Sequence, residues 1–462
     1  MIRLQRQVGI PIVVSCALMM QQLDSSAIAT ALPAMSQSLS VPVVDLHTAI
    51  TAYLFSSAMF LPVSGWAADR FGQKLVFCLA IAVFTAGSIS CALATNLQIL
   101  LLARILQGLG GAMMVPVARL ILVREVEKTD LVAAMALMSM TAVIGPAAGP
   151  LLGGLITTVA SWRLIFWINV PIGVIGIICT MLFIREVRSH ARRSFDGIGF
   201  VLTAIGFGGI MVLLEAVSSS GRLDIRDMVP FVFGVGALAA YYWHYRLRQR
   251  AILDLALFRY ATFRASLLGG SIFRIGLGSL PFLLPLLMQT VFNYSPLQSG
   301  FFTFMSAIGS FGIRANMKRI LGRFGFRTVL IVNSLTANLS VWVCSLFSYG
   351  TPKFWIMGIL LFGGVFRALQ MVSVNTMAFA ELIPEEMSDA TTLSQIAQRI
   401  SQSMGVSMAA FLLAVYGRQG GHASLHAFSM SFRLISLVSA ISVLFFFMLP
   451  ANAGEAIVHR KR

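Results

Sequence analysis

The chain is 462 residues long, 58% hydrophobic and only 11% charged, and its mean hydropathy is +0.85. Soluble globular domains carry about 25% charged residues, so this composition argues against a soluble protein and predicts an integral membrane protein. The net charge of +17 would suit a nucleic-acid-binding protein. The basic residues, however, recur in short clusters between apolar runs instead of forming one patch, which argues against that class.

Fourteen apolar segments, each about long enough to cross a bilayer as a helix, occupy most of the chain and leave no sizeable soluble domain. They lie near residues 9–32, 47–67, 76–95, 98–118, 131–157, 163–184, 196–217, 228–245, 264–291, 298–317, 328–349, 354–378, 391–416 and 428–449. The first follows Arg3 and Arg6 and imitates a secretory signal. It continues to about Ala31 without a credible cleavage site, so we interpret it as the first membrane helix.

The basic clusters predict the orientation of the chain. With the N-terminus in the cytoplasm, the cytoplasmic loops hold Arg70, Lys74, Arg119, Arg124, Lys128, Arg185, Arg188, Arg192, Arg193, Arg246, Arg248, Arg250, Arg259, Lys318, Arg319, Arg323, Arg327 and the tail 459–462. The opposite loops hold little beyond Arg222, Arg226, Lys353 and Arg418. The positive-inside rule therefore predicts a multi-pass protein of the cell inner membrane with both termini in the cytoplasm.

A short sequence recurs at one place in this topology. The stretch "GWAADRFGQK" at 65–74 lies between the second and third segments, and "GRFGFR" at 322–327 lies between the tenth and eleventh. If the seventh and eighth segments are an inserted pair, these are equivalent loops of two parallel six-helix halves. The sequence predicts an all-α integral membrane fold of fourteen transmembrane helices. Its parts are an N-terminal six-helix bundle (1–190), an inserted two-helix linker (191–255), and a C-terminal six-helix bundle with a short basic tail (256–462).

Five motifs follow one another along the first half of the chain. They are "LDSSAIATALP" (23–33), "GWAADRFGQK" (65–74), "RILQGLGG" (104–111), "GPLLGG" (149–154) and "WRLIFWINVPIG" (162–173). Their order resembles that in major facilitator transporters, most closely the fourteen-helix drug:proton antiporter-2 family and its MdtD-type multidrug exporters. The resemblance implies the major facilitator fold and proton-driven export. The family pattern usually has threonine at Ser26 and asparagine at Ala29, which bears on polar contacts to the substrate.

The 65–74 loop is a candidate gate. Gly65 and Gly72 allow a tight turn and close backbone approach, and Asp69 can cap a facing helix or pair with an arginine in one conformation. The resemblance implies a cytoplasmic latch that favours the outward-facing state and includes Asp69, Arg70 and Lys74. The alternative is a solvated loop whose charges only set the topology.

A second candidate gating element is the stretch "GPAAGPLLGG". Gly145, Gly149 and Gly153 recur every four residues and line one helical face, which permits close helix packing. Pro146 and Pro150 each remove a backbone N–H and favour a kink. Packing alone would explain the glycines, whereas the paired prolines favour a bending helix. The resemblance implies an antiporter and is the main ground for export.

Arg104 is a candidate for proton coupling. Arg104, Gln107, Gly108 and Gly111 share one helical face. An arginine inside a membrane costs about 2.5 kcal/mol or more unless it is paired or hydrated. We therefore expect Arg104 to face a water-filled cavity, with Gln107 as a substrate contact, or else to extend to the surface. The resemblance assigns the proton-coupling role to this arginine.

Asp24 is the strongest candidate for a proton carrier. It lies about 15 residues into the first helix, roughly 22 Å along it. Desolvation at that depth favours the protonated carboxyl, so Asp24 could carry protons or act as counter-ion to a cationic substrate. The alternative is a structural partner of Arg104 or of another arginine. Glu215, near the end of the seventh segment, is a second and weaker candidate.

The second half contains arginines without nearby acidic residues. No aspartate or glutamate lies between Asp254 and Glu381, yet Arg274 and Arg367 fall near mid-helix. The positive charges of these arginines could be compensated by Asp24, by carbonyl oxygens or water, or by a bound anion. We therefore consider Arg274, Arg367, Gln370 and Arg399 as substrate-binding residues, beside Asp24 and Gln107. They carry the alternative function, which is proton-driven export of an anionic metabolite or metal chelate such as a polycarboxylate or siderophore.

Other classes lack their signatures. The sequence has no G-x-x-x-x-G-K-[ST] loop for an ATP-driven pump, and its histidines and cysteines show no metal-ligand or disulfide spacing. We expect a transporter and no enzyme. It should need no metal and no cofactor beyond the proton motive force. Its partners should be membrane lipid, protons and a small-molecule substrate, without nucleic acid or an obligate protein partner.

Overall fold

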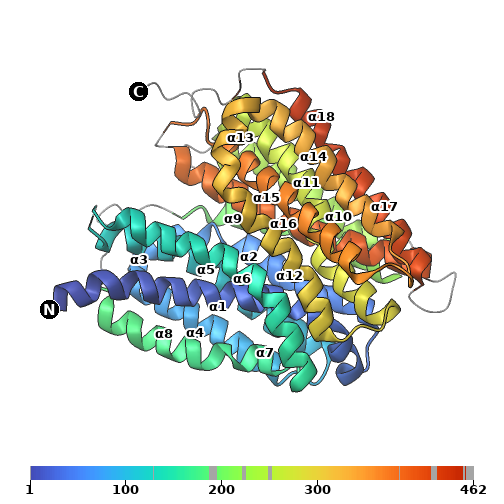
Figure 1. Cartoon of the computed structure of the whole chain (residues 1–462). Coiled ribbons are helices and arrows are strands. Elements are labelled where there is room, and N and C mark those ends of the chain that lie inside the picture. Colours follow the sequence, from blue (N-terminus) through green and yellow to red (C-terminus); the bar gives the residue numbers. More distant parts are fainter. Residues whose placement is uncertain are drawn as a thin grey trace. The chain divides into compact units, whose positions relative to one another are not determined.

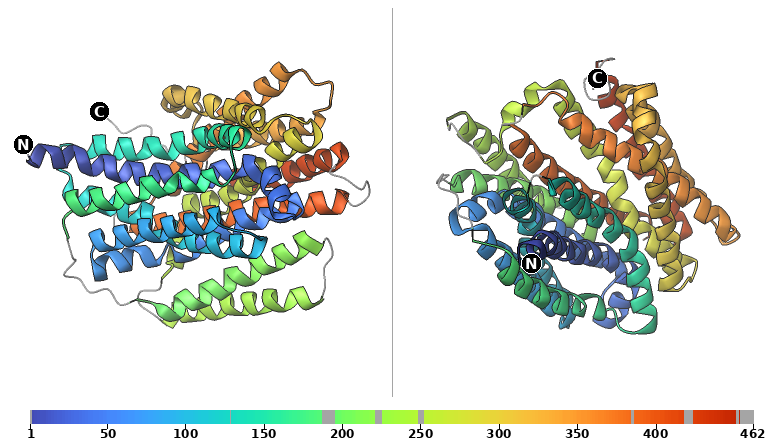
Figure 2. Two further views of the ribbon diagram at one scale, coloured as in Figure 1. Left: turned by 90° about the horizontal axis from the view of Figure 1, so that it is seen from below. Right: turned by 60° about the vertical axis from the view of Figure 1, so that its left-hand side comes forward.

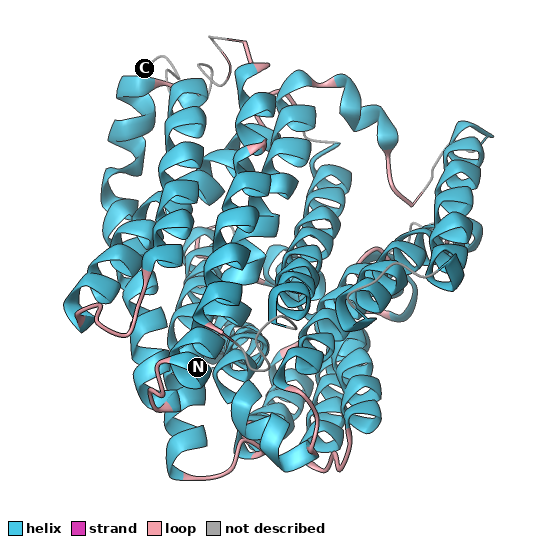
Figure 3. Ribbon diagram, turned by 90° about the vertical axis from the view of Figure 1, so that its right-hand side faces the viewer, coloured by secondary structure: helices cyan, strands magenta, loops and turns pink. Residues whose placement is uncertain are grey.

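The computed structural model describes residues 2–127, 129–186, 195–220, 225–247, 252–383, 386–417, 424–450 and 453. Within these ranges the chain is helical and has no strand (Figures 1 and 3). The predicted boundary between residues 190 and 191 lies outside the described residues. So do Lys128, Arg188, Arg192, Arg193, Arg222, Arg248, Arg250, Arg418 and the tail 459–462.

The helices follow the apolar segments closely. In chain order they are α1 (Ile2–Leu39), η1 (Val43–Leu46), α2 (His47–Phe60), α3 (Val63–Phe71), α4 (Gln73–Ala92), α5 (Leu97–Glu125), α6 (Leu131–Val159), α7 (Leu164–Trp167), α8 (Asn169–Phe183), α9 (Gly197–Ser220), α10 (Ile225–Leu247), η2 (Leu255–Arg259), α11 (Ala261–Leu286), η3 (Leu287–Val291), α12 (Pro296–Gly312), η4 (Ile313–Asn316), α13 (Met317–Phe324), α14 (Phe326–Val343), η5 (Cys344–Leu346), α15 (Lys353–Ala378), α16 (Met387–Gly417), α17 (Leu425–Ala440) and α18 (Ser442–Phe447).

Twelve stretches of the described chain are long and apolar enough to cross a membrane. The two predicted segments outside this set are the eighth, which forms α10, and the tenth, which forms α12. Tyrosines and a histidine lower the hydropathy of the last part of α10. Helix α12 has only 17 residues and ends at Gly312, where a short 3₁₀ turn begins. A multi-pass helical membrane protein is therefore confirmed, whereas the count of fourteen spans is not.

The chain divides into two compact units. Unit 1 comprises Met1–Ala204 with Ser295–Gly300, and unit 2 comprises Ile205–Tyr294 with Phe301–Arg462. In unit 1, α1 packs along α6 and α8, while α5 packs along α2 and α4 (Figure 2). In unit 2, α11 packs against α15, α16, α17 and α18, and α14 packs against α15 and α17.

Glycines explain how closely α6 approaches α1. A Cβ atom at Gly145 would lie 2.3 Å from Gln22 Cβ, and one at Gly149 would lie 1.8 Å from Ser26 Oγ. A Cβ at Gly153 would lie 2.4 Å from the Ala27 carbonyl oxygen. The predicted glycine face therefore exists and is occupied by α1, as small-residue packing between membrane helices requires.

The repeated loop sequence forms the same turn in both units. Gly72 separates α3 from α4 with φ of 97°, and Gly325 separates α13 from α14 with φ of 73°. Each N–H donates to the carbonyl four residues earlier, at 3.1 Å for Gly72 and 3.0 Å for Gly325. Only glycine adopts such a conformation readily. These two glycines are 253 residues apart, as expected for two related halves.

A basic side chain anchors each of these turns to a later helix of the same unit, α8 for the first turn and α18 for the second. Lys74 Nζ donates to the Met181 carbonyl at 2.6 Å, and Arg327 Nη2 donates to the Phe447 carbonyl at 3.0 Å. Lys74 and Arg327 are also 253 residues apart. At that spacing the counterpart of Asp69 is Gly322, so the repeat conserves the turn and the anchor but not the carboxylate.

Candidate functional site

The carboxylate of Asp24 lies inside unit 1, where α1, α5 and α8 meet. The residue is 1% exposed. Arg104 Nη1 donates to its Oδ2 at 2.7 Å, Gln107 Nε2 donates to its Oδ1 at 2.9 Å, and Asn169 Nδ2 donates to its Oδ1 at 2.7 Å. Three N–H donors, one of them cationic, therefore point at one carboxylate, and the bond from Arg104 is charge-assisted.

Arg104 is held on several sides at once. Its Nη1 also donates to Gln107 Oε1 at 2.6 Å, and its Nε donates to the Ala49 carbonyl at 3.0 Å. The guanidinium carbon lies 4.5 Å from the centre of the Tyr53 ring and 5.9 Å from that of Phe166, which are cation–π distances. Arg104 is 0% exposed, so in this structure it neither faces a water-filled cavity nor extends to the surface, and both expectations are wrong.

Ser88 on α4 completes the cluster. Its hydroxyl accepts hydrogen bonds from Gln107 Nε2 at 2.7 Å and Asn169 Nδ2 at 3.2 Å, and it donates to the Phe84 carbonyl at 3.0 Å. Four helices therefore supply one buried polar network. We call Asp24, Arg104, Gln107, Asn169 and Ser88 the Asp24 cluster.

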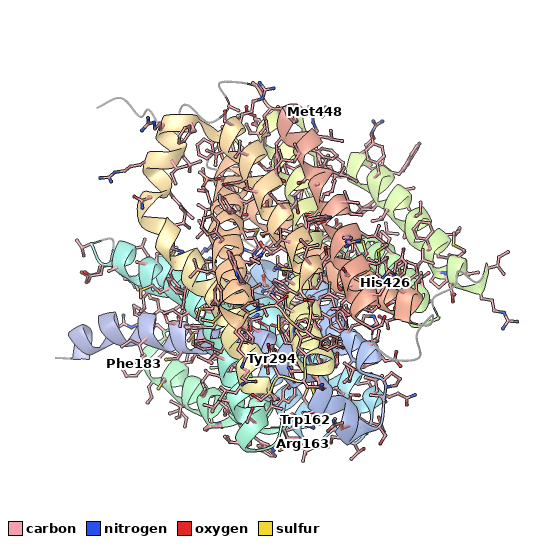
Figure 4. The ribbon with its side chains drawn as sticks, turned by 45° about the vertical axis from the view of Figure 1, so that its right-hand side comes forward. Trp162, Arg163, Phe183, Tyr294, His426 and Met448 are labelled. Atoms are coloured by element: carbon pink, nitrogen blue, oxygen red, sulfur yellow. The ribbon has the colours of Figure 1, made fainter. Side chains whose placement is uncertain are left out.

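The "WRLIFWINVPIG" motif explains how Asn169 reaches this cluster. Trp162 is 3% exposed, and the Arg163 guanidinium lies 4.4 Å from its ring centre (Figure 4). Arg163 also donates to the Ala94 carbonyl at 3.0 Å and to Ser38 Oγ at 2.9 Å. These contacts fix the turn before α8, whose first residue is Asn169.

Sequence reasoning found only part of the cluster. It proposed Asp24, Arg104 and Gln107, and it included the pairing of Asp24 with Arg104 as an alternative, which the geometry bears out. It missed Asn169 and Ser88. Asn169 lies within a motif that had been noted, so its position was the available signal. Ser88 gave none, because serine is common in membrane helices.

The candidate gate residues differ in their contacts. Arg124 Nη2 donates to Asp69 Oδ1 at 2.9 Å, with the side chains 25% and 18% exposed. A Cβ at Gly72 would lie 1.5 Å from Glu186 Oε1, so close backbone approach is confirmed there. Gly65 instead lies inside α3, and no described atom is within 4 Å of an added Cβ. The turn expected at Gly65 is therefore wrong, and Arg70 is exposed.

A polar contact missed by sequence reasoning lies beside this loop. Gln73 Nε2 donates to Glu125 Oε1 at 2.9 Å, and the Arg185 backbone N–H lies 3.1 Å from both oxygens of the same carboxylate. Glu125 thus joins the first residue of α4 to the segment that follows α8. Together with Lys74, it ties the loop to two other helices of unit 1.

The prolines of α6 lie in a continuous helix. Pro146 and Pro150 both fall within Leu131–Val159. A Cβ at Gly300 would lie 2.2 Å from the Pro150 carbonyl oxygen. The Ser26 hydroxyl lies 3.3 Å from the Gly145 carbonyl oxygen. The bending role remains a prediction.

The two predicted mid-helix arginines of unit 2, Arg274 and Arg367, have neutral partners. Arg274 on α11 is 2% exposed and donates through Nη2 to Asn375 Oδ1 at 2.6 Å. Arg367 on α15 is 6% exposed and donates through Nη2 to Ser306 Oγ at 2.7 Å. Gln370 is 0% exposed, and within the described part of the chain neither its oxygen nor its nitrogen has a hydrogen-bond partner.

The other proposed site residues are less enclosed. Arg399 on α16 and Glu215 on α9 are both half-buried. In the ranges that the structure describes, no group of three or more His, Cys, Asp or Glu side chains could hold a metal ion.

Comparisons with known proteins agree on the type of protein. The model of the Major Facilitator Superfamily matches residues 14–406. "Putative multidrug resistance protein MdtD" of Enterobacter sp. (strain 638) is 34% identical over 457 residues, covering 97% of this chain and 96% of that protein. The Escherichia coli protein of the same name is 36% identical over 461 residues, covering 97% of each chain.

Solved structures show the same fold at low sequence identity. A crystal structure of the D-xylose-proton symporter is similar with a TM-score of 0.69 and 12% identity, covering 97% of this chain and 99% of that one. A crystal structure of the peptide transporter POT in complex with sulfate has a TM-score of 0.70 and 13% identity, covering 97% and 95%.

Proposed function

Because the chain belongs to the Major Facilitator Superfamily and is a transporter, not an enzyme, we propose that it exports small molecules in exchange for protons by alternating access. The relatives named as multidrug resistance proteins support multidrug-type efflux as the activity. The observation that carries proton coupling is the fully buried Asp24 cluster, in which a titratable carboxylate is bound to a buried arginine.

Protonation of Asp24 would break the balance of its cluster. A proton on either oxygen places an O–H against N–H donors that already point at that carboxylate. It also leaves Arg104 as a buried cation without its counter-charge, and breaking a buried ion pair in this way costs about 3–5 kcal/mol. The protonated protein therefore favours a conformation in which these side chains separate, which couples proton binding to a change of state.

The membrane supplies energy for this cycle. Each proton that moves inward down the membrane potential releases roughly 2.3 kcal/mol per 100 mV. Asp24 is the proton-binding residue in this scheme, and Arg104 competes with the proton for the carboxylate. Gln107 and Asn169 hold the carboxylate in position. Glu215 is a weaker second candidate for proton binding.

The loop around Gly72 and the glycine face of α6 are the proposed moving parts. Asp69, Arg70 and Lys74 would hold α3 and α4 against α5 and α8 in one end state and release them in the other. The contacts Asp69–Arg124 and Lys74–Met181 support this role. In α6, Gly145, Pro146, Gly149, Pro150 and Gly153 form the face that would bend or slide on α1.

The proposed architecture is two six-helix bundles with an inserted pair, α9 and α10. The pair packs through small residues, since a Cβ at Gly209 would lie 2.2 Å from the Pro230 carbonyl oxygen. Counting α10 and α12 as spans gives fourteen, an even number that would leave both termini on the same side of the membrane. The basic loops support the cytoplasmic side of a cell inner membrane. The N-terminal bundle would end near residue 190 and the C-terminal bundle would begin near residue 256.

The test is flux through purified protein in liposomes under an imposed pH gradient. Ethidium and 1-naphthoate serve as a cationic and an anionic probe, and a dye trapped inside reports proton movement. Asp24→Asn should abolish gradient-driven flux and the coupled proton movement. Asp130→Asn, an exposed aspartate before α6, is the control and should transport normally. Unchanged coupled flux in Asp24→Asn would remove Asp24 from the mechanism.

A further inference from the structure

A four-residue pattern occurs in both units at matching places. Helix α5 carries "RILQ" at 104–107, and helix α15 carries "RALQ" at 367–370. The arginine and glutamine of both copies are buried, with exposed fractions of 0% and 0% in α5 and 6% and 0% in α15. The two copies stand 263 residues apart, whereas Gly72 and Gly325 stand 253 apart, so the copies match by helix and not by that spacing. Each lies on the helix that follows the one beginning at the repeated turn, α5 after α4 and α15 after α14.

The two copies differ in what they bind. In unit 1 both Arg104 and Gln107 donate to one carboxylate, that of Asp24. The α15 copy lies in a stretch that has no aspartate or glutamate between Asp254 and Glu381. Within the described residues, no carboxylate pairs with Arg367, whose recorded hydrogen bond goes to the Ser306 hydroxyl.

Gln370 is the sign that a partner is missing from this copy. Neither polar atom of its buried side chain has a partner among the described residues. A buried amide without hydrogen bonds is destabilising, and so is a buried guanidinium without a counter-charge. One carboxylate would supply an acceptor to both groups, because it accepts from the arginine on one oxygen and from the amide nitrogen on the other. The amide oxygen of Gln370 would still need a donor, which Arg104 provides to Gln107 Oε1 in unit 1.

We propose that Arg367 and Gln370 bind the carboxylate of a small-molecule substrate, in the way that Arg104 and Gln107 bind the carboxylate of Asp24. The inference rests on the proposed transport function and narrows its substrate class to acidic or zwitterionic compounds. Such compounds include drug-like molecules in which a carboxylate is joined to an apolar frame.

The repeat provides a matched pair of substitutions. Gln370→Glu places a side-chain carboxylate next to Arg367, where it would replace the carboxylate of the substrate. It should therefore raise the melting temperature and abolish binding of carboxylate ligands. Gln107→Glu places a second carboxylate at the position of Gln107 Nε2, 2.9 Å from Asp24 Oδ1, so it should lower the melting temperature. The measurement is thermal unfolding of the purified full-length protein in detergent. A fall in both variants would overturn the proposal.

Ligand binding is measured on the same preparation without any gradient. The probes are 1-naphthoate, its neutral analogue 1-naphthamide, inorganic phosphate and tetraphenylphosphonium. Of these four probes, only 1-naphthoate should raise the melting temperature of the wild-type protein, and it should do so in a concentration-dependent manner. Because it removes a charge-assisted contact, Arg367→Ala should weaken naphthoate binding by ~10- to 100-fold, and Gln370→Ala by ~10-fold.

The matched control is Arg433→Ala. Arg433 on α17 also donates to a serine hydroxyl, Ser345 Oγ at 3.3 Å, but it belongs to no R-x-L-Q pattern. Its replacement should leave naphthoate affinity unchanged. Equal losses in both arginine variants would overturn the proposal, as would a response to naphthamide or phosphate equal to that of naphthoate, or no response to naphthoate. These binding measurements need no transport, so they test the substrate class separately from proton coupling. Coupled flux can be lost in Asp24→Asn even if naphthoate does not bind, and naphthoate can bind even if Asp24→Asn transports normally.

Discussion

Replacing Asn169 with alanine tests whether the Asp24 cluster is held together as the geometry indicates. The substitution removes a 2.7 Å hydrogen bond to the Asp24 carboxylate and a 3.2 Å bond to Ser88. A hydrogen bond to a charged group contributes about 1.5–3 kcal/mol. Ser88 keeps its bond from Gln107, so the second loss is small. We expect Asn169→Ala to lower the free energy of unfolding by about 2–3 kcal/mol.

The assay is equilibrium unfolding of the purified protein in mixed micelles, with Asp24→Asn as the second arm of a double-mutant cycle. Once Asp24 is neutral, the Asn169 amide no longer donates to a charge, so its removal should cost about 1 kcal/mol or less. The difference between the two backgrounds, about 1–2 kcal/mol, is the coupling between Asn169 and Asp24. The pH dependence of flux should also shift in Asn169→Ala, which a purely structural residue would not cause.

Asn333 on α14 is the control for a buried asparagine. It is 4% exposed, and its Nδ2 has no partner in the part of the chain that the structure describes. Asn333→Ala therefore should cost less than about 1 kcal/mol, because it removes an unsatisfied donor. Additive costs for Asn169→Ala and Asp24→Asn, or an equal cost at Asn333, would refute the reasoning.

Two predictions concern glycines. Gly149→Ala should destabilise unit 1 by about 1–3 kcal/mol, because its Cβ would lie 1.8 Å from Ser26 Oγ. Gly65→Ala, in open space within α3, should instead stabilise the protein by up to about 1 kcal/mol in the same unfolding assay, because alanine favours a helix over glycine. Gly72→Ala should be more destabilising than Gly325→Ala: both turns have positive φ, but only the first would place a Cβ against Glu186. Equal effects in either pair would contradict these contacts.

The membrane class and most helices could be predicted because long apolar runs have few alternatives in water or lipid. The partnership of Asp24 with Arg104 was also within reach, since two opposite charges deep in apolar helices must be compensated. The ends of the helices were harder to predict from the sequence. The second predicted segment, 47–67, is divided by Pro62 into α2 and α3, and α12 stops at Gly312.

The polar residues of the site could be predicted only where they carry a charge or share a helical face with a charged residue, as Gln107 does with Arg104. Asn169 on α8 and Ser88 on α4 meet only because tertiary packing brings these two helices together. That packing produces no periodic pattern in the sequence. Gly65 and Gly72 look alike as letters in the loop, yet only Gly72 has positive φ. The difference arises because α3 extends through Gly65 and ends at Phe71.

Lys74 and Arg327 reach main-chain oxygens, those of Met181 and Phe447. Every amino acid has such an oxygen, so residues 181 and 447 can be substituted without loss of these hydrogen bonds. An alignment of the two halves would therefore show no shared letter at the receiving end. The two matching contacts are made to the main chain, so a comparison of residue types does not detect their receiving ends.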